Sequence, residues 1–198
     1  MLINNKIYLS LIFIILFSGC NNPDSSGSML TQAEKDSAAL CIKPVPPADS
    51  AKFISQSIKV YGAVNKEIEL TVDSLRKMKT VALDSFQVVC ESGAEGSKSM
   101  MSRGVLLRDI LKKAGLNITN HKDRNFAIIA RATDNYKATF SWGEIFNNAT
   151  GDHTIVLYEE NGKPIRKFGE MKLICTNDIK TGPRQVVWLK AIEVTRVN

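Results

Sequence analysis

The sequence predicts an α+β domain in which strands dominate: a strand-rich mixed sheet with a few short helices. Short segments that alternate apolar and polar residues recur from about residue 58 onward, and such alternation is typical of strands with one buried face. Turns containing glycine or asparagine separate these segments, whereas helical spacing occurs in only a few places. Strands mixed with few helices indicate the α+β class.

The predicted domain begins with a hairpin and a short helix. Residues 58–61 and 67–71 alternate apolar and polar side chains on either side of a glycine-containing turn. Thr71 or Asp73 has the side chain of an N-cap residue, so a helix is expected over residues 74–78.

A long strand, a loop and the clearest helix are predicted next. Residues 80–90 are expected to form one strand that becomes buried towards its end, and the polar residues 91–102 to form a loop. Apolar residues recur at helical spacing from Val105 to Ala114, and Gly115 follows where a C-cap glycine belongs.

The remainder of the domain is predicted to consist mostly of strands. Asn161-Gly162 is typical of a tight turn between two strands, a second turn is expected at Asp134-Asn135, and a short helix over residues 144–147. Strands are expected at residues 126–131, 136–142, 154–158, 171–175 and 186–197.

The N-terminal residues have the layout of a cleaved export signal. Lys6 precedes an apolar run over residues 7–17, which ends in a small Ser-Gly pair before Cys20. The run is shorter than the roughly 20 residues that cross a bilayer as a helix, so the mature protein is expected to be anchored rather than spanning. Residues 17–20, Phe-Ser-Gly-Cys, resemble the lipobox of bacterial lipoproteins, in which the cysteine carries the lipid.

This layout divides the chain into three parts. Residues 1–19 are expected to be removed as a lipoprotein signal peptide, residues 20–57 to form a lipidated flexible tether, and residues 58–198 to form one domain. Acyl chains on Cys20 would hold the protein on a membrane of the bacterial cell envelope, on its extracytoplasmic side. The alternative is ordinary cleavage near the same position, which would give a soluble secreted protein.

The charge balance indicates which classes of binding partner to expect. The chain has 26 Lys and Arg residues against 20 Asp and Glu residues, with a formal net charge of +6. It contains no long run of like charges and no basic helix interleaved with aromatic residues, so nucleic acid is not an expected partner. A mildly positive balance suits an anionic small ligand or a phosphate-bearing cofactor, and it equally suits a plain solvated surface.

The cysteines are the most informative single residue type. With Cys20 assigned to lipid, Cys41, Cys90 and Cys175 remain, and one disulfide plus one free thiol is expected outside the cytosol. Cys90 ends an apolar strand and opens a glycine-containing loop, where function is often placed. The alternatives are a small buried hydrophobe or half of a Cys90–Cys175 disulfide. Neither histidine has a partner at metal-ligand spacing, so no zinc site is expected.

A series of short segments carries a family resemblance. The segments are Gly62-Ala-Val, Leu70-Thr-Val-Asp-Ser-Leu, Val88-Val-Cys, Arg103-Gly-Val-Leu-Leu-Arg-Asp-Ile-Leu, Lys113-Ala-Gly, Asp134-Asn-Tyr, Ile155-Val-Leu-Tyr-Glu-Glu-Asn-Gly-Lys-Pro, Gly169-Glu-Met-Lys-Leu and Val187-Trp-Leu-Lys-Ala-Ile-Glu. Their order and spacing resemble the oxidoreductase molybdopterin-binding domain, the fold of sulfite oxidases and of the periplasmic methionine-sulfoxide reductase catalytic subunit. The resemblance covers nearly all of residues 58–197.

The resemblance implies a cofactor, molybdenum-molybdopterin, and residues that would hold it. In that family the cysteine that ends this strand gives its thiolate to molybdenum, and Cys90 stands at the matching place, as the catalytic and metal-binding residue. Lys172 stands where the family commonly has an arginine, and Arg184 lies near a family lysine. Both would meet the phosphate of the pterin.

Several positions depart from the family pattern. Glu170 replaces a proline and places a negative charge beside the expected phosphate site, Val187 replaces a lysine, and Asn135 replaces the glycine of Asp-Gly-Tyr. Some cofactor contacts are therefore missing, and the sequence leaves the presence of molybdopterin open.

Two functions follow from these observations. The first is an envelope oxidoreductase that binds molybdopterin through Cys90 and transfers oxygen atoms, with an unidentified electron-transfer partner. The second is a cofactor-free binding or interaction module that keeps the fold and uses its cleft for another small ligand. A thiol redox protein is a third reading, which lacks a Cys-x-x-Cys pair. The state of Cys90 separates the first two, because the enzyme needs a free thiol facing a basic cleft.

Overall fold

The computed structural model describes residues 51–166 and 169–197. All of the described residues lie in one compact unit. The predicted signal peptide, the lipid-carrying Cys20 and most of the predicted tether lie outside the described residues. Within the described ranges, no helix is long and apolar enough to cross a membrane.

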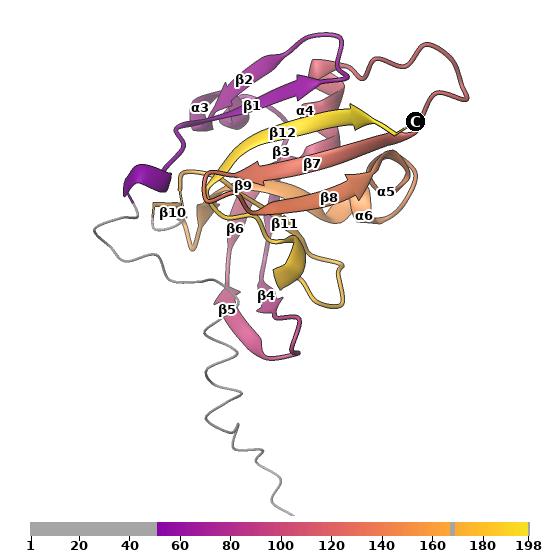
Figure 1. Cartoon of the computed structure of the whole chain (residues 1–198). Coiled ribbons are helices and arrows are strands. Elements are labelled where there is room, and N and C mark those ends of the chain that lie inside the picture. The colour runs from indigo at the N-terminus through magenta and orange to yellow at the C-terminus, as the bar shows by residue number, and fades with distance from the viewer. Residues whose placement is uncertain (1–50, 167–168, 198) are drawn as a thin grey trace, which may run out of the picture. The chain divides into compact units, whose positions relative to one another are not determined.

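The first sheet contains the predicted N-terminal hairpin, and it has the strand order β2-β1-β12-β7-β8 (Figure 1). β1 pairs with β12 in parallel, whereas the other neighbours are antiparallel. This mixed pairing agrees with the predicted mixed sheet. The strands are β1 (Ser57–Gly62), β2 (Ile68–Thr71), β7 (Phe126–Ala132), β8 (Lys137–Ser141) and β12 (Leu189–Arg196).

The second sheet has the strand order β10-β9-β6-β3, and β11 pairs with β9 beside this path. All its pairs are antiparallel. The Asn161-Gly162 turn joins β9 to β10 as predicted, and both residues have positive φ, of 51° and 70°. The strands are β3 (Thr80–Leu83), β6 (Ser102–Leu106), β9 (Thr154–Glu160), β10 (Lys163–Pro164) and β11 (Lys172–Cys175).

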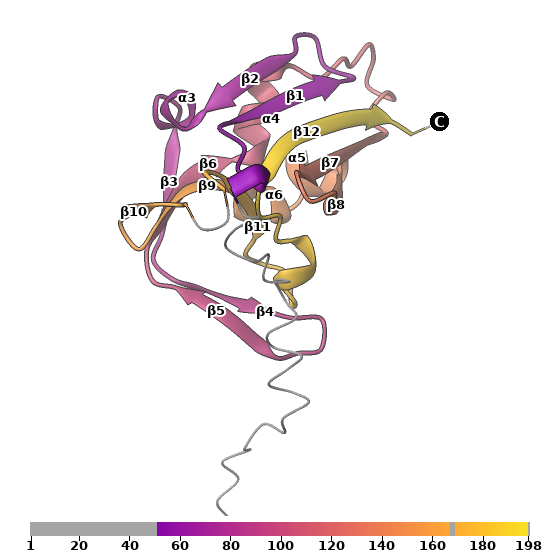
Figure 2. The ribbon, with the colours of Figure 1, turned by 60° about the vertical axis from the view of Figure 1, so that its left-hand side comes forward.

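A two-stranded ribbon of β4 (Phe86–Val89) and β5 (Glu95–Ser99) corrects two sequence predictions. The single strand expected over residues 80–90 is interrupted after Leu83, so that β3 and β4 belong to different sheets. The loop expected over residues 91–102 contains β5. This strand has no large apolar side chain and pairs through its backbone, so no alternating pattern marks it in the sequence. The ribbon extends away from the two larger sheets (Figure 2).

The helices are short. Thr71 caps α3 (Val72–Arg76), where its hydroxyl accepts a hydrogen bond from the Ser74 backbone at 3.3 Å. α4 (Leu107–Ala114) begins two residues later than its apolar spacing predicts, because Val105 and Leu106 belong to β6. The remaining helices of the described residues are α5 (Trp142–Phe146), α6 (Thr150–His153) and the 3₁₀ turns η1 (Ala51–Phe53) and η2 (Gly182–Arg184).

The second sheet is buried on both faces. Along β9, Val156 and Tyr158 belong to the larger core cluster, whereas Ile155 and Leu157 belong to a smaller cluster. That smaller cluster includes Phe86 of β4, so side chains at the base of the ribbon pack against one face of the sheet. Side chains of a strand alternate between the two faces, and burial of both faces explains why β9 reads as a continuous apolar run.

Candidate functional site

Cys90 follows directly after β4 and is buried. Its backbone N–H donates to the carbonyl of Ala94 and its carbonyl accepts from Gly93, both at 2.9 Å, so the residue lies in a closed turn at the tip of the ribbon. The sulfur of Cys90 is disulfide-bonded, whereas Cys175 on β11 is a free thiol. The two cysteines therefore do not pair with each other, which excludes the Cys90–Cys175 disulfide that the sequence left open. Cys41 lies outside the described residues.

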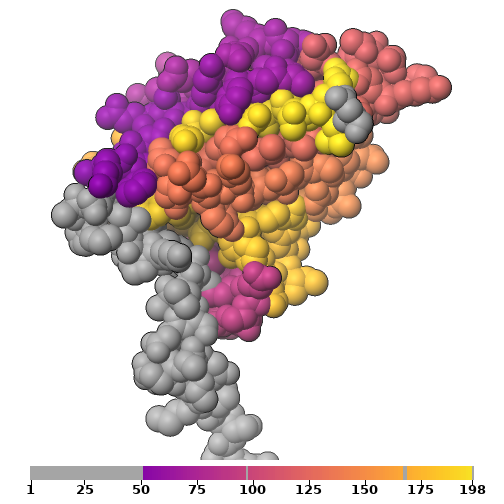
Figure 3. Space-filling model, in the orientation of Figure 1, coloured from indigo at the N-terminus to yellow at the C-terminus, as the bar shows by residue number. Residues whose placement is uncertain are grey.

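The segment after β11 packs on the end of β4 and fixes the surroundings of Cys90. The buried hydroxyl of Thr181 accepts from the Val89 backbone N–H and donates to the Gln87 carbonyl, each at 2.9 Å. A Cβ at Gly182 would lie 2.9 Å from the Val89 carbonyl oxygen, so the close approach favours glycine at this position. In the space-filling view, the magenta ribbon and the yellow C-terminal part of the chain lie side by side (Figure 3).

Lys172 begins β11 and is 3% exposed. Its ammonium group forms an ion pair with Glu160 and lies 5.6 Å from the centroid of the Phe86 ring. Burial lowers the pKa of Lys172 below its usual value, although the charge of Glu160 opposes this shift. The cation that the family resemblance assigns to a phosphate is thus compensated by a carboxylate of the same chain.

Arg184 has two carboxylate partners. Its Nε donates to Asp178 at 2.8 Å, its Nη1 donates to Glu144 at 2.7 Å, and its guanidinium carbon lies 4.4 Å from the centroid of the Phe140 ring. Hydrogen bonds to Asp178 hold the pKa of Arg184 above its usual value. Burial alone would raise the pKa of Glu144, but hydrogen bonds from Ser141 and Arg184 outweigh this effect, and the pKa lies below its usual value.

Cys175 lies beside this ion-pair cluster. Its thiol donates to the side-chain oxygen of Asn177 at 3.1 Å and accepts from the Thr154 hydroxyl at 3.5 Å, and Nη2 of Arg184 lies 3.9 Å away. Burial raises the pKa of the Cys175 thiol. Because the thiolate is the reactive form, a raised pKa makes this sulfur a poor nucleophile and gives no support to a thiol redox function.

These contacts test whether the residues fit molybdopterin. The cofactor needs a thiolate for the metal and cationic donors for its phosphate. Here the Cys90 sulfur is in a disulfide, and the charges of Lys172 and Arg184 are both compensated by carboxylates. Next to Arg184 in the chain, Nε2 of the buried Gln185 is a donor without a hydrogen-bond partner among the described residues. The amide of Gln185 does not replace a thiolate for the metal and two cations for the phosphate, so this arrangement does not fit the cofactor.

The resemblance proposed Cys90, Lys172 and Arg184 as cofactor ligands, but the sequence did not reveal the carboxylates that pair with the two cations. Glu160, Asp178 and Glu144 come from three separate segments, and of these only Glu144 has a signal in the sequence, the capping box that it forms with Ser141. Among the described residues, no group of three or more His, Cys, Asp or Glu side chains could hold a metal ion.

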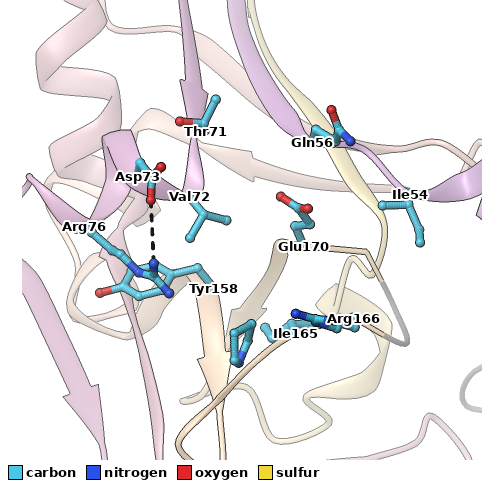
Figure 4. A pocket seen from close by; sticks show the side chains of 11 residues that line it. Ile54, Gln56, Thr71, Val72, Asp73, Arg76, Tyr158, Ile165, Arg166 and Glu170 are labelled. Atoms are coloured by element: carbon cyan, nitrogen blue, oxygen red, sulfur yellow. Dashed lines mark ion pairs between the residues drawn. The ribbon is translucent and has the colours of Figure 1, made fainter.

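A cavity of about 800 Å³ lies elsewhere in the domain, between α3, the end of β9 and the connection from β10 to β11 (Figure 4). Its lining includes none of Cys90, Lys172 and Arg184. It combines apolar side chains with arginines and carboxylates, and one of the carboxylates, Glu170, is the residue that the resemblance placed beside the expected phosphate site.

Comparisons with known proteins address the fold and the family. The family model described as "Oxidoreductase molybdopterin binding domain" matches residues 43–198. Among solved structures, the Sulfane Dehydrogenase SoxCD from Paracoccus pantotrophus is similar, with a TM-score of 0.55 and 14% sequence identity over 70% of this chain and 37% of that chain. This likeness confirms the predicted fold class, and this chain spans little more than a third of the SoxCD chain. No curated protein matches the sequence.

Proposed function

The chain belongs to the oxidoreductase molybdopterin-binding domain family. Within this family, we propose that it is a lipid-anchored envelope protein whose domain acts as a binding module without molybdopterin. The observation that carries the proposal is that the three groups expected to hold the cofactor are already engaged. The Cys90 sulfur is in a disulfide, Lys172 is paired with Glu160, and Arg184 is held by two carboxylates.

Electrostatics favour this proposal over a loaded cofactor site. A phosphate placed at Lys172 or Arg184 would approach Glu160 or Asp178 as well, and like charges in a partly buried site repel strongly. Displacing either carboxylate would leave it without a partner, and breaking a buried ion pair costs about 3–5 kcal/mol. The ion pairs therefore act as internal substitutes for the charge of a ligand.

The exported and anchored state is part of the proposal and rests on the sequence. The apolar run before Cys20 and the lipobox-like residues 17–20 support it. We expect Cys20→Ser to release the protein from membranes into the soluble fraction. Persistence of the variant on membranes after a high-salt wash would show that lipid on Cys20 is not the anchor.

An oxygen-atom-transfer oxidoreductase is the second candidate. Family membership favours it, as does the position of Cys90 at the end of β4, where the family has its metal ligand. The solved relative is described as a sulfane dehydrogenase, but at 14% identity its activity belongs to that protein. For this candidate, the Cys90 disulfide would first have to be reduced to supply a free thiolate.

Elemental analysis for molybdenum, with pterin fluorescence, on protein purified from its native envelope distinguishes the two candidates. Cells whose other molybdoenzymes are loaded provide the control. We expect no molybdenum, both in the oxidised protein and after mild reduction in the presence of the cofactor. Near-stoichiometric molybdenum that disappears in Cys90→Ser would overturn the binding-module proposal and establish the enzyme.

A further inference from the structure

From the cavity between α3, β9 and the β10–β11 connection we infer a binding site for a short peptide with free charged termini. The cavity shares no lining residue with the Cys90, Lys172 and Arg184 positions. The inference rests on the proposed binding function, since a binding module needs a ligand site, but it names a different place in the domain and can fail separately.

Apolar side chains supply the contact surface for such a ligand. Ile165 is 6% exposed and belongs to the smaller core cluster, so it offers a fixed apolar wall. Val72 is half-buried. Ile54 is 40% exposed and lies across the cavity from Val72 in Figure 4. Sites for small molecules combine apolar walls with placed polar groups, and the lining of this cavity contains both kinds of side chain.

On one side of the cavity, Arg76 lies beside an aromatic ring. Its guanidinium carbon is 5.7 Å from the centroid of the buried Tyr158 ring, and its Nη1 is 3.6 Å from an Asp73 oxygen (Figure 4). The ion pair is long and its side chains are exposed, so it holds Arg76 only weakly. Arg76 can therefore turn to another carboxylate at little cost.

Two further charges line the cavity without a partner among the described residues. Arg166 and Glu170 form no ion pair and no side-chain hydrogen bond with residues in the described part of the chain. Both come from the connection between β10 and β11, and Figure 4 shows both side chains at the cavity. A ligand that carries one carboxylate and one ammonium group would satisfy both of them.

The balance of charge and the size of the cavity define the ligand class. The lining contributes two arginines and two carboxylates, so it carries no net positive charge for a nucleotide or another polyanion. A volume of about 800 Å³ lies in the range of drug-sized ligands, of roughly 300–1,000 Å³, and exceeds the needs of one amino acid. A peptide of a few residues matches the size, the mixed apolar and polar lining and the opposite charges of the cavity.

Titration calorimetry on the full lipoprotein in detergent tests this inference, with the tripeptide Ala-Leu-Ala as probe. We expect the peptide with free termini to bind at least about tenfold more tightly than the same peptide acetylated and amidated, than free leucine, and than inorganic phosphate. Equal binding of free and blocked peptide, binding of leucine as tight as that of the peptide, or no binding of the free peptide would overturn the assignment.

Charge-removing variants locate the binding. Arg166→Ala and Glu170→Ala should each weaken the peptide about tenfold, because each removes a hydrogen bond to a charged group. Lys163→Ala is the matched control, since Lys163 lies in β10, just before the connection, and does not line the cavity. This variant should bind the peptide as tightly as the wild type does. Equal affinities in all three variants would refute the site. The molybdenum content of the same samples tests the proposed function separately from peptide binding, because bound molybdenum would contradict that function whether or not the peptide binds.

Discussion

Nη1 of Arg184 lies 2.7 Å from Oε1 of Glu144, and the same Glu144 side chain closes the capping box at the start of α5. One carboxylate thus fixes a helix N-terminus and holds the cation that the family resemblance assigns to a phosphate. The charge of Arg184 serves the fold of this chain rather than an external anion.

Removal of Arg184 should therefore destabilise the domain. Arg184→Met leaves Glu144 and Asp178 without their partner, and we expect the free energy of unfolding to fall by about 2 kcal/mol in urea denaturation. Arg103→Met is the control, because the Arg103–Glu159 pair is long, at 3.6 Å, and its arginine is exposed; its loss should stay below about 0.5 kcal/mol. Similar losses in both variants would show that Arg184 is not a structural cation.

The lowered pKa of Glu144 predicts that the free energy of unfolding decreases in acid. The pKa of Glu144 is lower in the folded protein than its usual value, so its contribution to stability is present above the unfolded-state pKa and is lost as pH falls through the folded-state pKa. Wild-type stability should therefore decline on acidification below about pH 5. In urea titrations between about pH 3 and 6, the free energy of unfolding should decline less for Glu144→Gln than for the wild type. The same pH dependence in both proteins would show that Glu144 is not the group responsible.

Lys172 and Glu160 should behave as a coupled buried pair. Lys172→Met leaves Glu160 uncompensated, and we expect a loss of about 3 kcal/mol in the free energy of unfolding. Adding Glu160→Gln removes the uncompensated charge and should restore part of that loss, which a double-mutant cycle measures. Additive losses would mean that the two side chains do not depend on each other. Lys172→Glu brings two carboxylates together and should impair folding itself.

The two described cysteines should differ in reactivity after unfolding. When the purified protein is unfolded without reductant and alkylated, Cys175 should be labelled, whereas Cys90 should be labelled only after reduction. Mass spectrometry of the peptides reads both results and identifies the cysteine bonded to Cys90. Labelling of Cys90 without reduction would remove the main obstacle to a metal at this sulfur.

Gly182 should not tolerate a side chain. Gly182→Ala places a Cβ 2.9 Å from the Val89 carbonyl oxygen, and we expect a loss of about 1–3 kcal/mol in the free energy of unfolding. Gly143→Ala is the control, since its nearest neighbour would be 3.9 Å away and a helical alanine is favoured over glycine by about 0.5–1 kcal/mol. The midpoint of thermal unfolding should be at least as high for Gly143→Ala as for the wild type, and lower for Gly182→Ala. A midpoint for Gly182→Ala at or above that of Gly143→Ala would refute the close packing on β4.

Local patterns predicted the elements that local interactions determine. The β1–β2 hairpin, the turn at Asn161 and the capped start of α3 follow from alternation, turn residues and an N-cap side chain. The break between β3 and β4 and the existence of β5 could not be predicted in this way. They depend on which sheet each strand pairs with, and β5 contributes backbone hydrogen bonds rather than apolar side chains.

The same limit applies to the candidate site. The resemblance located Cys90, Lys172 and Arg184 because family patterns follow sequence order. It could not show that Glu144, 40 positions before Arg184 in the chain, meets the guanidinium, because such a contact exists only after folding. Charge compensation is a property of the assembled structure, and it decides whether a cation is available to a ligand.

The parallel pairing of β1 with β12 has a consequence for how the protein is made. β12 occupies the middle of the first sheet, between β1 and β7, yet it is the last strand of the described chain. While residues 189–196 are still in the ribosome, the strands on either side have no central partner, and the sheet cannot close. Folding of this sheet must therefore wait for residues 189–196, which keeps the growing chain open during synthesis.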